Sequence, residues 1–132
     1  MAFTYESEKR EFVRVGVAVP VKYRLIATGT HHEVGDAYLD GETQNVGAGG
    51  MLLVGPIPPA DLITDLLVQK IVVGVRIYLP GEDAPVEALC RAVWLEAVDE
   101  ADDKCALGLS FKEITSDAQD MLFRFIISSR MG

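Results

Sequence analysis

The sequence has few of the residues on which disulfide frameworks and metal centres depend. Its 132 residues include two cysteines and two histidines. Cys90 and Cys105 are too few for a disulfide framework and lack metal-ligand spacing, so we expect reduced thiols in the core. His31 and His32 are neighbours, and on an extended chain neighbouring side chains point in opposite directions. No third histidine is present to complete a ligand shell, so we expect a solvated loop there and no metal.

Long apolar segments and an excess of basic residues are missing as well. Residues 1–10 have no apolar stretch behind their charges, unlike a signal peptide, and Arg76 interrupts the apolar segment 71–79. Twelve Lys and Arg against 20 Asp and Glu give a net charge of −8, which disfavours a nucleic-acid polymer and an anionic membrane as partners. We expect a cytoplasmic protein. A local arginine cluster can still bind one small anion, because salt screens exposed charges beyond about 8 Å.

Residues typical of catalysis are also scarce. The glycine-rich segment 47–50 is not followed by Lys-Ser or Lys-Thr, so it is not a P-loop. The only histidines lie in a polar segment, which leaves no general base for a serine nucleophile. The acidic segment 99–103 lacks the ligand spacing of a calcium loop. These absences predict that the protein is not an enzyme and has no catalytic residues.

What the sequence does contain is a succession of strand patterns. With 49% hydrophobic and 24% charged residues, the chain is typical of one folded domain. Apolar residues alternate with polar or small ones from Val13 to Leu25, which indicates a half-buried strand. We expect a polar loop at 28–36 and a short helix at 60–67. The strands are expected at 13–25, 37–46, 51–54, 71–79, 86–98 and 105–112.

The last segment changes period. Apolar residues from Ala118 to Ile126 follow helical spacing, and Ser116 with Gln119 forms a plausible capping box. Short antiparallel strands must hide their edges, which closing into a barrel does most completely. We therefore predict a mainly β protein, a small six-stranded antiparallel barrel at 15–112 with a C-terminal helix at 116–130.

Two motifs lie beside this predicted barrel. Arg10 and Arg14 form R-x-x-x-R, with Lys9 adjacent, and residues 45–50 read N-x-G-x-x-G at a turn between strands. In this order, with R-A-V-W at 91–94 and L-G-L-S-F at 107–111, the sequence resembles the PilZ domain family. That family carries R-x-x-x-R before its first barrel strand and [D/N]-x-S-x-x-G at the next turn. The resemblance spans most of the chain, as one domain over 1–132 with an N-terminal arm at 1–14.

The resemblance implies a bacterial second-messenger receptor that binds cyclic di-GMP without any cofactor. Arg10 and Arg14, helped by Lys9, would hold phosphates and guanines, which suits a planar guanidinium. Asn45 would bind a guanine edge, and Gly50 would allow close backbone approach and an unusual φ. Ligand binding would order the arm and relay a signal to an unidentified downstream protein in motility or biofilm control. The receptor would be a monomer or a homodimer.

Gly47 departs from the family pattern, which has serine at this position. Loss of one neutral hydrogen bond costs about 0.5–1.5 kcal/mol, so weakened binding is favoured over abolished binding. The alternative is a degenerate PilZ-fold interaction module, related to pili or motility, that does not bind the nucleotide. Glu8 and Glu11 could also pair with the two arginines as an ordinary solvated surface. Trp94 is expected in the core.

Overall fold

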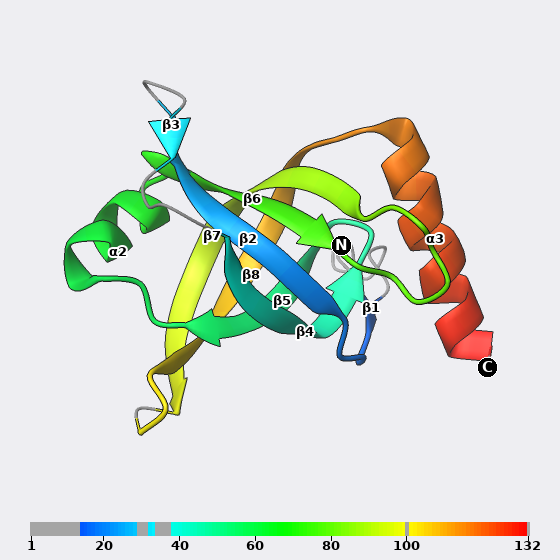
Figure 1. The fold of residues 1–132 in the computed structure, drawn as a ribbon, viewed down its shortest axis with the longest axis horizontal. Helices are drawn as coiled ribbons and strands as arrows, with labels where there is room; N and C mark the ends of the chain where they lie inside the picture. The colour runs from blue at the N-terminus through cyan, green and yellow to red at the C-terminus, as the bar shows by residue number, and fades with distance from the viewer. Residues whose placement is uncertain (1–13, 29–31, 34–37, 100, 132) are drawn as a thin grey trace, which may run out of the picture.

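The computed structural model describes residues 14–28, 32–33, 38–99 and 101–131. Within them lie eight strands and two helices (Figure 1). The elements in chain order are β1 (Arg14–Val15), β2 (Pro20–Ala27), β3 (His32–Glu33), β4 (Leu39–Gly47), β5 (Gly50–Pro56), α2 (Ala60–Leu67), β6 (Ile71–Ile77), β7 (Val86–Asp99), β8 (Lys104–Ile114) and α3 (Ser116–Met131).

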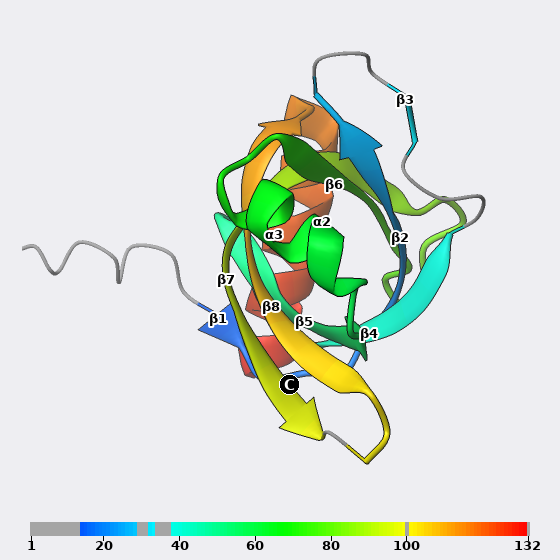
Figure 2. The same cartoon turned by 90° about the vertical axis from the view of Figure 1, so that its left-hand side faces the viewer.

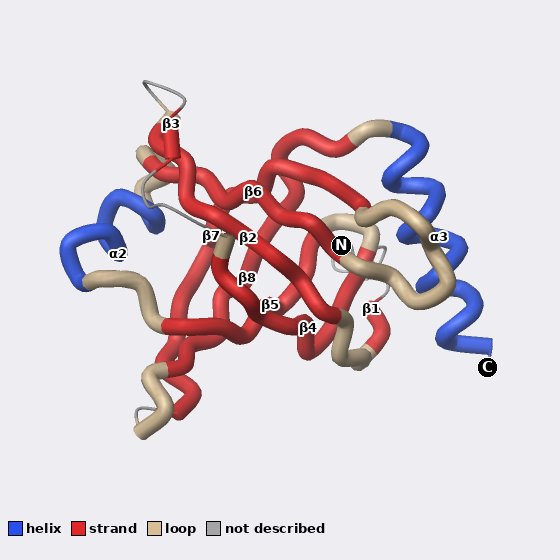
Figure 3. The backbone as a smooth tube through the Cα atoms, in the orientation of Figure 1, coloured by secondary structure: helices blue, strands red, loops and turns tan. Residues whose placement is uncertain are grey.

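Six of the strands close into an antiparallel barrel. Their order around the barrel is β2, β4, β5, β8, β7 and β6, and β6 pairs again with β2. Val21 shows the closure directly, because its Cα partners are Gly41 on β4 and Ile77 on β6. The tube in Figure 3 shows the strands wrapped around a single interior. The predicted mainly β fold with a six-stranded antiparallel barrel is confirmed.

The two helices lie at opposite ends of the barrel. Figure 1 places α2 and α3 on its two sides, and Figure 2, turned by 90°, shows α2 in front of α3. Leu66 of α2 and Leu122 of α3 are both fully buried and belong to the barrel core. Each helix therefore closes one end of the barrel with apolar side chains, and the removal of this surface from water stabilises the fold. Neither helix in the described part of the chain is long and apolar enough to cross a membrane.

The expected first strand is broken rather than continuous. β1 ends at Val15, and β2 begins at Pro20. Proline has no N–H to donate to a neighbouring strand, and the first position of a strand tolerates this. Thr43, a buried polar residue of β4, holds the break: its Oγ1 accepts from Val19 N at 2.9 Å and donates to Val17 O at 2.5 Å. These two hydrogen bonds hold residues 17–19 outside the strands, so β1 is separate from β2 and pairs with β4.

Two further details differ from the expectation. The short strand β3 pairs with the end of β2, within the segment expected to be a loop. The cap of α3 is Thr115, one residue before the expected Ser116, because Thr115 Oγ1 accepts from Ala118 N at 3.1 Å. This bond satisfies one of the free N–H groups at the start of the helix.

The two cysteines lie in the core, as predicted. Both are fully buried free thiols. Burial raises the pKa of Cys90 to about 12 and also raises the pKa of Cys105. Both thiols therefore remain protonated at neutral pH, which fits inert core residues.

Candidate functional site

The structure joins two of the predicted site residues, Arg14 and Asn45. β1 pairs antiparallel with the end of β4, so Arg14 lies opposite Gly47 and Val15 lies opposite Val46. Val15 is buried, and the alternation of a strand therefore places Arg14 on the outside. Arg14 Nη1 donates a hydrogen bond to Asn45 Oδ1 at 3.0 Å.

A bulge in β4 turns Asn45 outward. Thr43 and Val46 are both buried, although they lie three residues apart and regular alternation would put them on opposite faces. The pairing of β4 with β5 shifts register between Thr43 and Asn45, which accounts for the extra residue. Bulges of this kind redirect side chains. Without it, alternation from Thr43 would point Asn45 into the core.

Arg14 and Asn45 line a pocket of about 520 Å³. The described residues around it come from β1, β4, β5, β7, β8 and the turn before β5. They are Arg14, Asn45, Gly49, Leu52, Val93, Trp94, Gly108, Leu109, Ser110 and Phe111. Arg14 carries the only charge in this set. The pocket thus combines one cation, one amide and one hydroxyl with an aromatic and aliphatic wall, in a chain whose net charge is −8.

The expectation that Trp94 lies in the core is wrong. Its side chain is 42% exposed and forms part of the pocket wall. A register shift between Ala92 and Trp94 places the tryptophan opposite Gly108 on the outer face. A Cβ on Gly108 would lie closer than 3.0 Å to the indole, so the ring rests against the backbone of β8. The signal for this arrangement is Gly108 itself, because a glycine inside a strand often marks a close approach.

Gly47 and Gly50, the two glycines that define N-x-G-x-x-G, lie next to the pocket rather than in its wall. Gly47 is buried in β4 opposite Arg14, and Gly50 begins β5 opposite Ser110. Among the described glycines, only Gly81 has a φ in the left-handed region, so the unusual φ expected at Gly50 is not found. The backbone of Gly50 instead lies close to β8, because a Cβ on Gly50 would lie 3.0 Å or less from the carbonyl of Leu109.

The other predicted site residues, Lys9 and Arg10, lie outside the described residues, as do Glu8 and Glu11. A further cation, which the sequence reasoning did not assign to the site, flanks the pocket. Arg91 lies opposite the pocket residue Ser110 in the β7–β8 ladder. Its buried Nε has no hydrogen-bond partner among the described residues.

A family model confirms the resemblance that the motifs suggest. The model of the PilZ domain matches residues 8–128, which is nearly the whole chain. The chain belongs to the PilZ domain family. No curated protein shows significant sequence similarity to it.

Solved structures share the fold at low sequence identity. The inhibitor of motility MotI/DgrA from Bacillus subtilis superposes with a TM-score of 0.67 and 18% identity over 92% of this PilZ chain. The match covers 51% of MotI, so the present chain spans about half the length of that protein. The PilZ domain of YcgR from Escherichia coli, solved with c-di-GMP, gives a TM-score of 0.60 and 12% identity over 94% of this chain and 93% of that one. The PilZ domain of CeSA from a cellulose-synthesizing bacterium gives a TM-score of 0.55 and 16% identity. That match covers 89% of this chain and 98% of the CeSA domain.

Proposed function

We propose that the protein is a receptor that binds cyclic di-GMP in the Arg14–Asn45 pocket. The observation that carries this proposal is the hydrogen-bonded Arg14–Asn45 pair beside the exposed indole of Trp94 in one pocket. Membership of the PilZ family and the likeness to the c-di-GMP-bound YcgR domain support it. Arg10 and Lys9 of the N-terminal segment would complete the site from the side of β1.

The chemistry of the pocket suits a ligand with purine rings and phosphates. Asn45 Oδ1 accepts from Arg14 and so fixes the orientation of the guanidinium, whose remaining N–H groups bond to no other described residue and can donate to a ligand. Guanine presents the acceptors O6 and N7, which arginine and amide donors recognise, and a guanidinium also matches a phosphate. The indole of Trp94 offers a surface on which a base can stack.

The same residues favour a receptor over an enzyme. The described residues of the pocket include no carboxylate, imidazole or thiol that could transfer a proton. Their donors and rings hold a ligand without changing it. A signal would then pass through the ordering of the N-terminal segment to a downstream protein in the cytoplasm, in a motility or biofilm pathway.

Calorimetric titration with cyclic di-GMP tests the proposal. We expect saturable binding, no response to GMP at the same concentration, and unchanged nucleotide after prolonged incubation. The stoichiometry reports whether one or two nucleotides bind. Absence of heat, together with an unchanged melting temperature at millimolar ligand, would overturn the receptor assignment.

Trp94 supplies an internal reporter of binding, because it is the only tryptophan of the chain. We expect its fluorescence to change on saturation with cyclic di-GMP, since a base would stack on the exposed indole. Trp94→Ala should weaken binding by about 5- to 150-fold, because base–aromatic stacking contributes about 1–3 kcal/mol. Trp94→Phe is the control and should retain most of the affinity. Unchanged fluorescence at full calorimetric saturation would exclude Trp94 from the site.

Gly47 supports one alternative, a PilZ-fold interaction module without nucleotide. A serine at this position could supply one further hydrogen bond, worth a few-fold to tenfold in affinity. If the protein is a receptor, Gly47→Ser should bind more tightly by about that factor in calorimetry. Binding that appears only in Gly47→Ser would favour the interaction module.

A further inference from the structure

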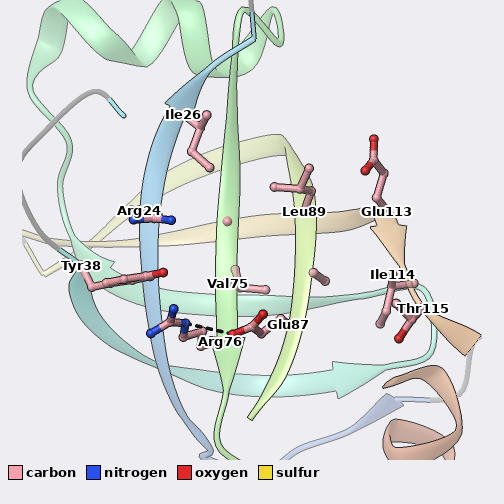
Figure 4. A pocket seen from close by; sticks show the side chains of 12 residues that line it. Arg24, Ile26, Tyr38, Val75, Arg76, Glu87, Leu89, Glu113, Ile114 and Thr115 are labelled. Atoms are coloured by element: carbon pink, nitrogen blue, oxygen red, sulfur yellow. Dashed lines mark ion pairs between the residues drawn. The ribbon is translucent and has the colours of Figure 1, made fainter. Parts of the chain in front are cut away.

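A second groove lies on the outer faces of β2, β6, β7 and β8. Its volume is about 580 Å³, and it shares no lining residue with the Arg14–Asn45 pocket. Figure 4 shows its side chains, with positive groups on one flank and negative groups on the other. The groove is therefore a separate feature that the proposed nucleotide site does not explain.

The charges of this groove follow the strand register. One row of directly paired positions crosses four strands from Arg24 through Gly74 and Leu89 to Glu113. The next row has Arg76 on β6 paired with Glu87 on β7. Both arginines lie on the β2–β6 side, and both glutamates lie on the β7–β8 side.

Tyr38 keeps the positive side in place. The guanidinium carbons of Arg24 and Arg76 lie 4.6 Å and 4.5 Å from the centre of its ring. In Figure 4 the ring lies between the two arginines. Arg76 Nε also lies 3.2 Å from Glu87 Oε2. Side chains held in this way lose less conformational freedom when a partner binds.

The middle of the row is apolar. Gly74 has no side chain, and a Cβ there would lie 3.1 Å from Ile26 Cδ1. Leu89, its neighbour in the row, is only partly buried on the outer face. The same Cβ would lie 3.8 Å from Leu89 Cδ2, so the side chains of Ile26 and Leu89 cover the Gly74 backbone and form a small apolar surface in the middle of the row.

We propose that this face is the interface of a homodimer, with the two-fold axis along the strands between β6 and β7. Rotation about this axis exchanges the two sides of each row. Arg24 then lies opposite Glu113 of the second copy, and Arg76 lies opposite Glu87. The apolar surface at Ile26 and Leu89 of each copy then meets that of the other between the two charged sides, so the surface is self-complementary, as a two-fold interface requires.

The charge pattern selects a second copy over other partners. A uniformly acidic partner would meet Glu87 and Glu113, and a uniformly basic one would meet Arg24 and Arg76. Like charges placed opposite each other in an interface are strongly unfavourable. A partner must place negative groups opposite Arg24 and Arg76 and positive groups opposite Glu87 and Glu113. A second copy of this face does so after the two-fold rotation. The groove and the Arg14–Asn45 pocket share no lining residue, so we expect the dimer to form with or without nucleotide.

Sedimentation velocity of the full chain over a range of concentrations tests the dimer. We expect a reversible monomer–dimer equilibrium that weakens about tenfold in Arg24→Glu and about tenfold in Glu113→Arg, because each substitution places like charges opposite each other twice. An equimolar mixture of the two variants should dimerise again, because Glu at position 24 then faces Arg at position 113. Glu82→Arg is the matched control, since Glu82 is exposed outside the groove and should leave the equilibrium unchanged.

Three results would overturn the proposal. The first is a monomer at all concentrations up to 1 mM, roughly the affinity of the weakest specific complexes. The second is a dimer that neither charge reversal weakens, which would place the interface elsewhere. The third is failure of the mixed variants to recover while each keeps the native melting temperature. Cyclic di-GMP titration of the same variants separates this proposal from the receptor assignment, because their nucleotide affinity should remain native.

Discussion

Replacement of Arg14 by alanine is expected to weaken cyclic di-GMP binding at least about 100-fold and to leave the barrel folded. The side chain is exposed, and among the described residues it hydrogen-bonds to Asn45 alone. The packing of β1 depends instead on Val15, which is buried. A hydrogen bond between charged groups contributes about 1.5–3 kcal/mol, and a guanidinium makes two such bonds to a phosphate or a guanine. Two bonds of this strength correspond to a factor of 100 or more.

Calorimetric titration of Arg14→Ala beside the native protein measures this loss, and thermal unfolding verifies the fold. Arg14→Lys keeps the charge but not the planar pair of donors, so its affinity should lie between the two. Arg124→Ala is the matched control, because it removes an exposed arginine from α3 outside the pocket. Native affinity in Arg14→Ala would remove this residue from the site.

Arg10→Ala should lower the affinity in the same direction. Arg10 is the first arginine of R-x-x-x-R, and the family's pattern assigns it the same two chemical tasks. Single and combined substitutions separate its contribution from that of Arg14. A combined variant that binds no more weakly than Arg14→Ala would show that Arg10 acts only through Arg14.

The barrel could be predicted because its strands are half-buried. A half-buried strand repeats with period two, and the segments around Val21, Val73 and Leu107 show that period directly. The helical period after Ser116 was equally clear, and α3 begins there. Antiparallel pairing with closure followed from the need to hide strand edges. Strand pairing and helix period are regular features, and a regular spacing of apolar residues in the sequence predicts them.

The candidate site could be predicted only in part, because it depends on irregularities. The bulge before Asn45 and the register shift before Trp94 each insert one residue and so reverse the face on which the next side chains lie. Period-two reasoning assigns Trp94 to the core for this reason. The motif identified Arg14 and Asn45, but their contact depends on the break after β1 that Thr43 holds. No local sequence pattern predicts a hydrogen bond between residues 24 positions apart, such as that from Val19 N to Thr43 Oγ1.

Gly50→Ala is expected to lower the free energy of unfolding by about 3 kcal/mol, the upper part of the range for overpacking a core. The new methyl group would meet the carbonyl of Leu109, which belongs to the β5–β8 ladder and cannot rotate away as a side chain could. Relief requires the two strands to separate where β5 begins. Urea unfolding followed by circular dichroism measures the change as a lower transition midpoint.

Gly16→Ala is the control for Gly50→Ala. A Cβ on Gly16 would lie 3.8 Å from Gln44 O, an ordinary van der Waals distance, so its midpoint should stay near the native value. Equal midpoints for the two variants would contradict the packing argument. If Gly50→Ala is the less stable, the last glycine of N-x-G-x-x-G is required by the fold whether or not a nucleotide binds. Nucleotide binding is then tested by Arg14, Asn45 and Trp94, whose side chains line the pocket and can be changed without altering a strand pair.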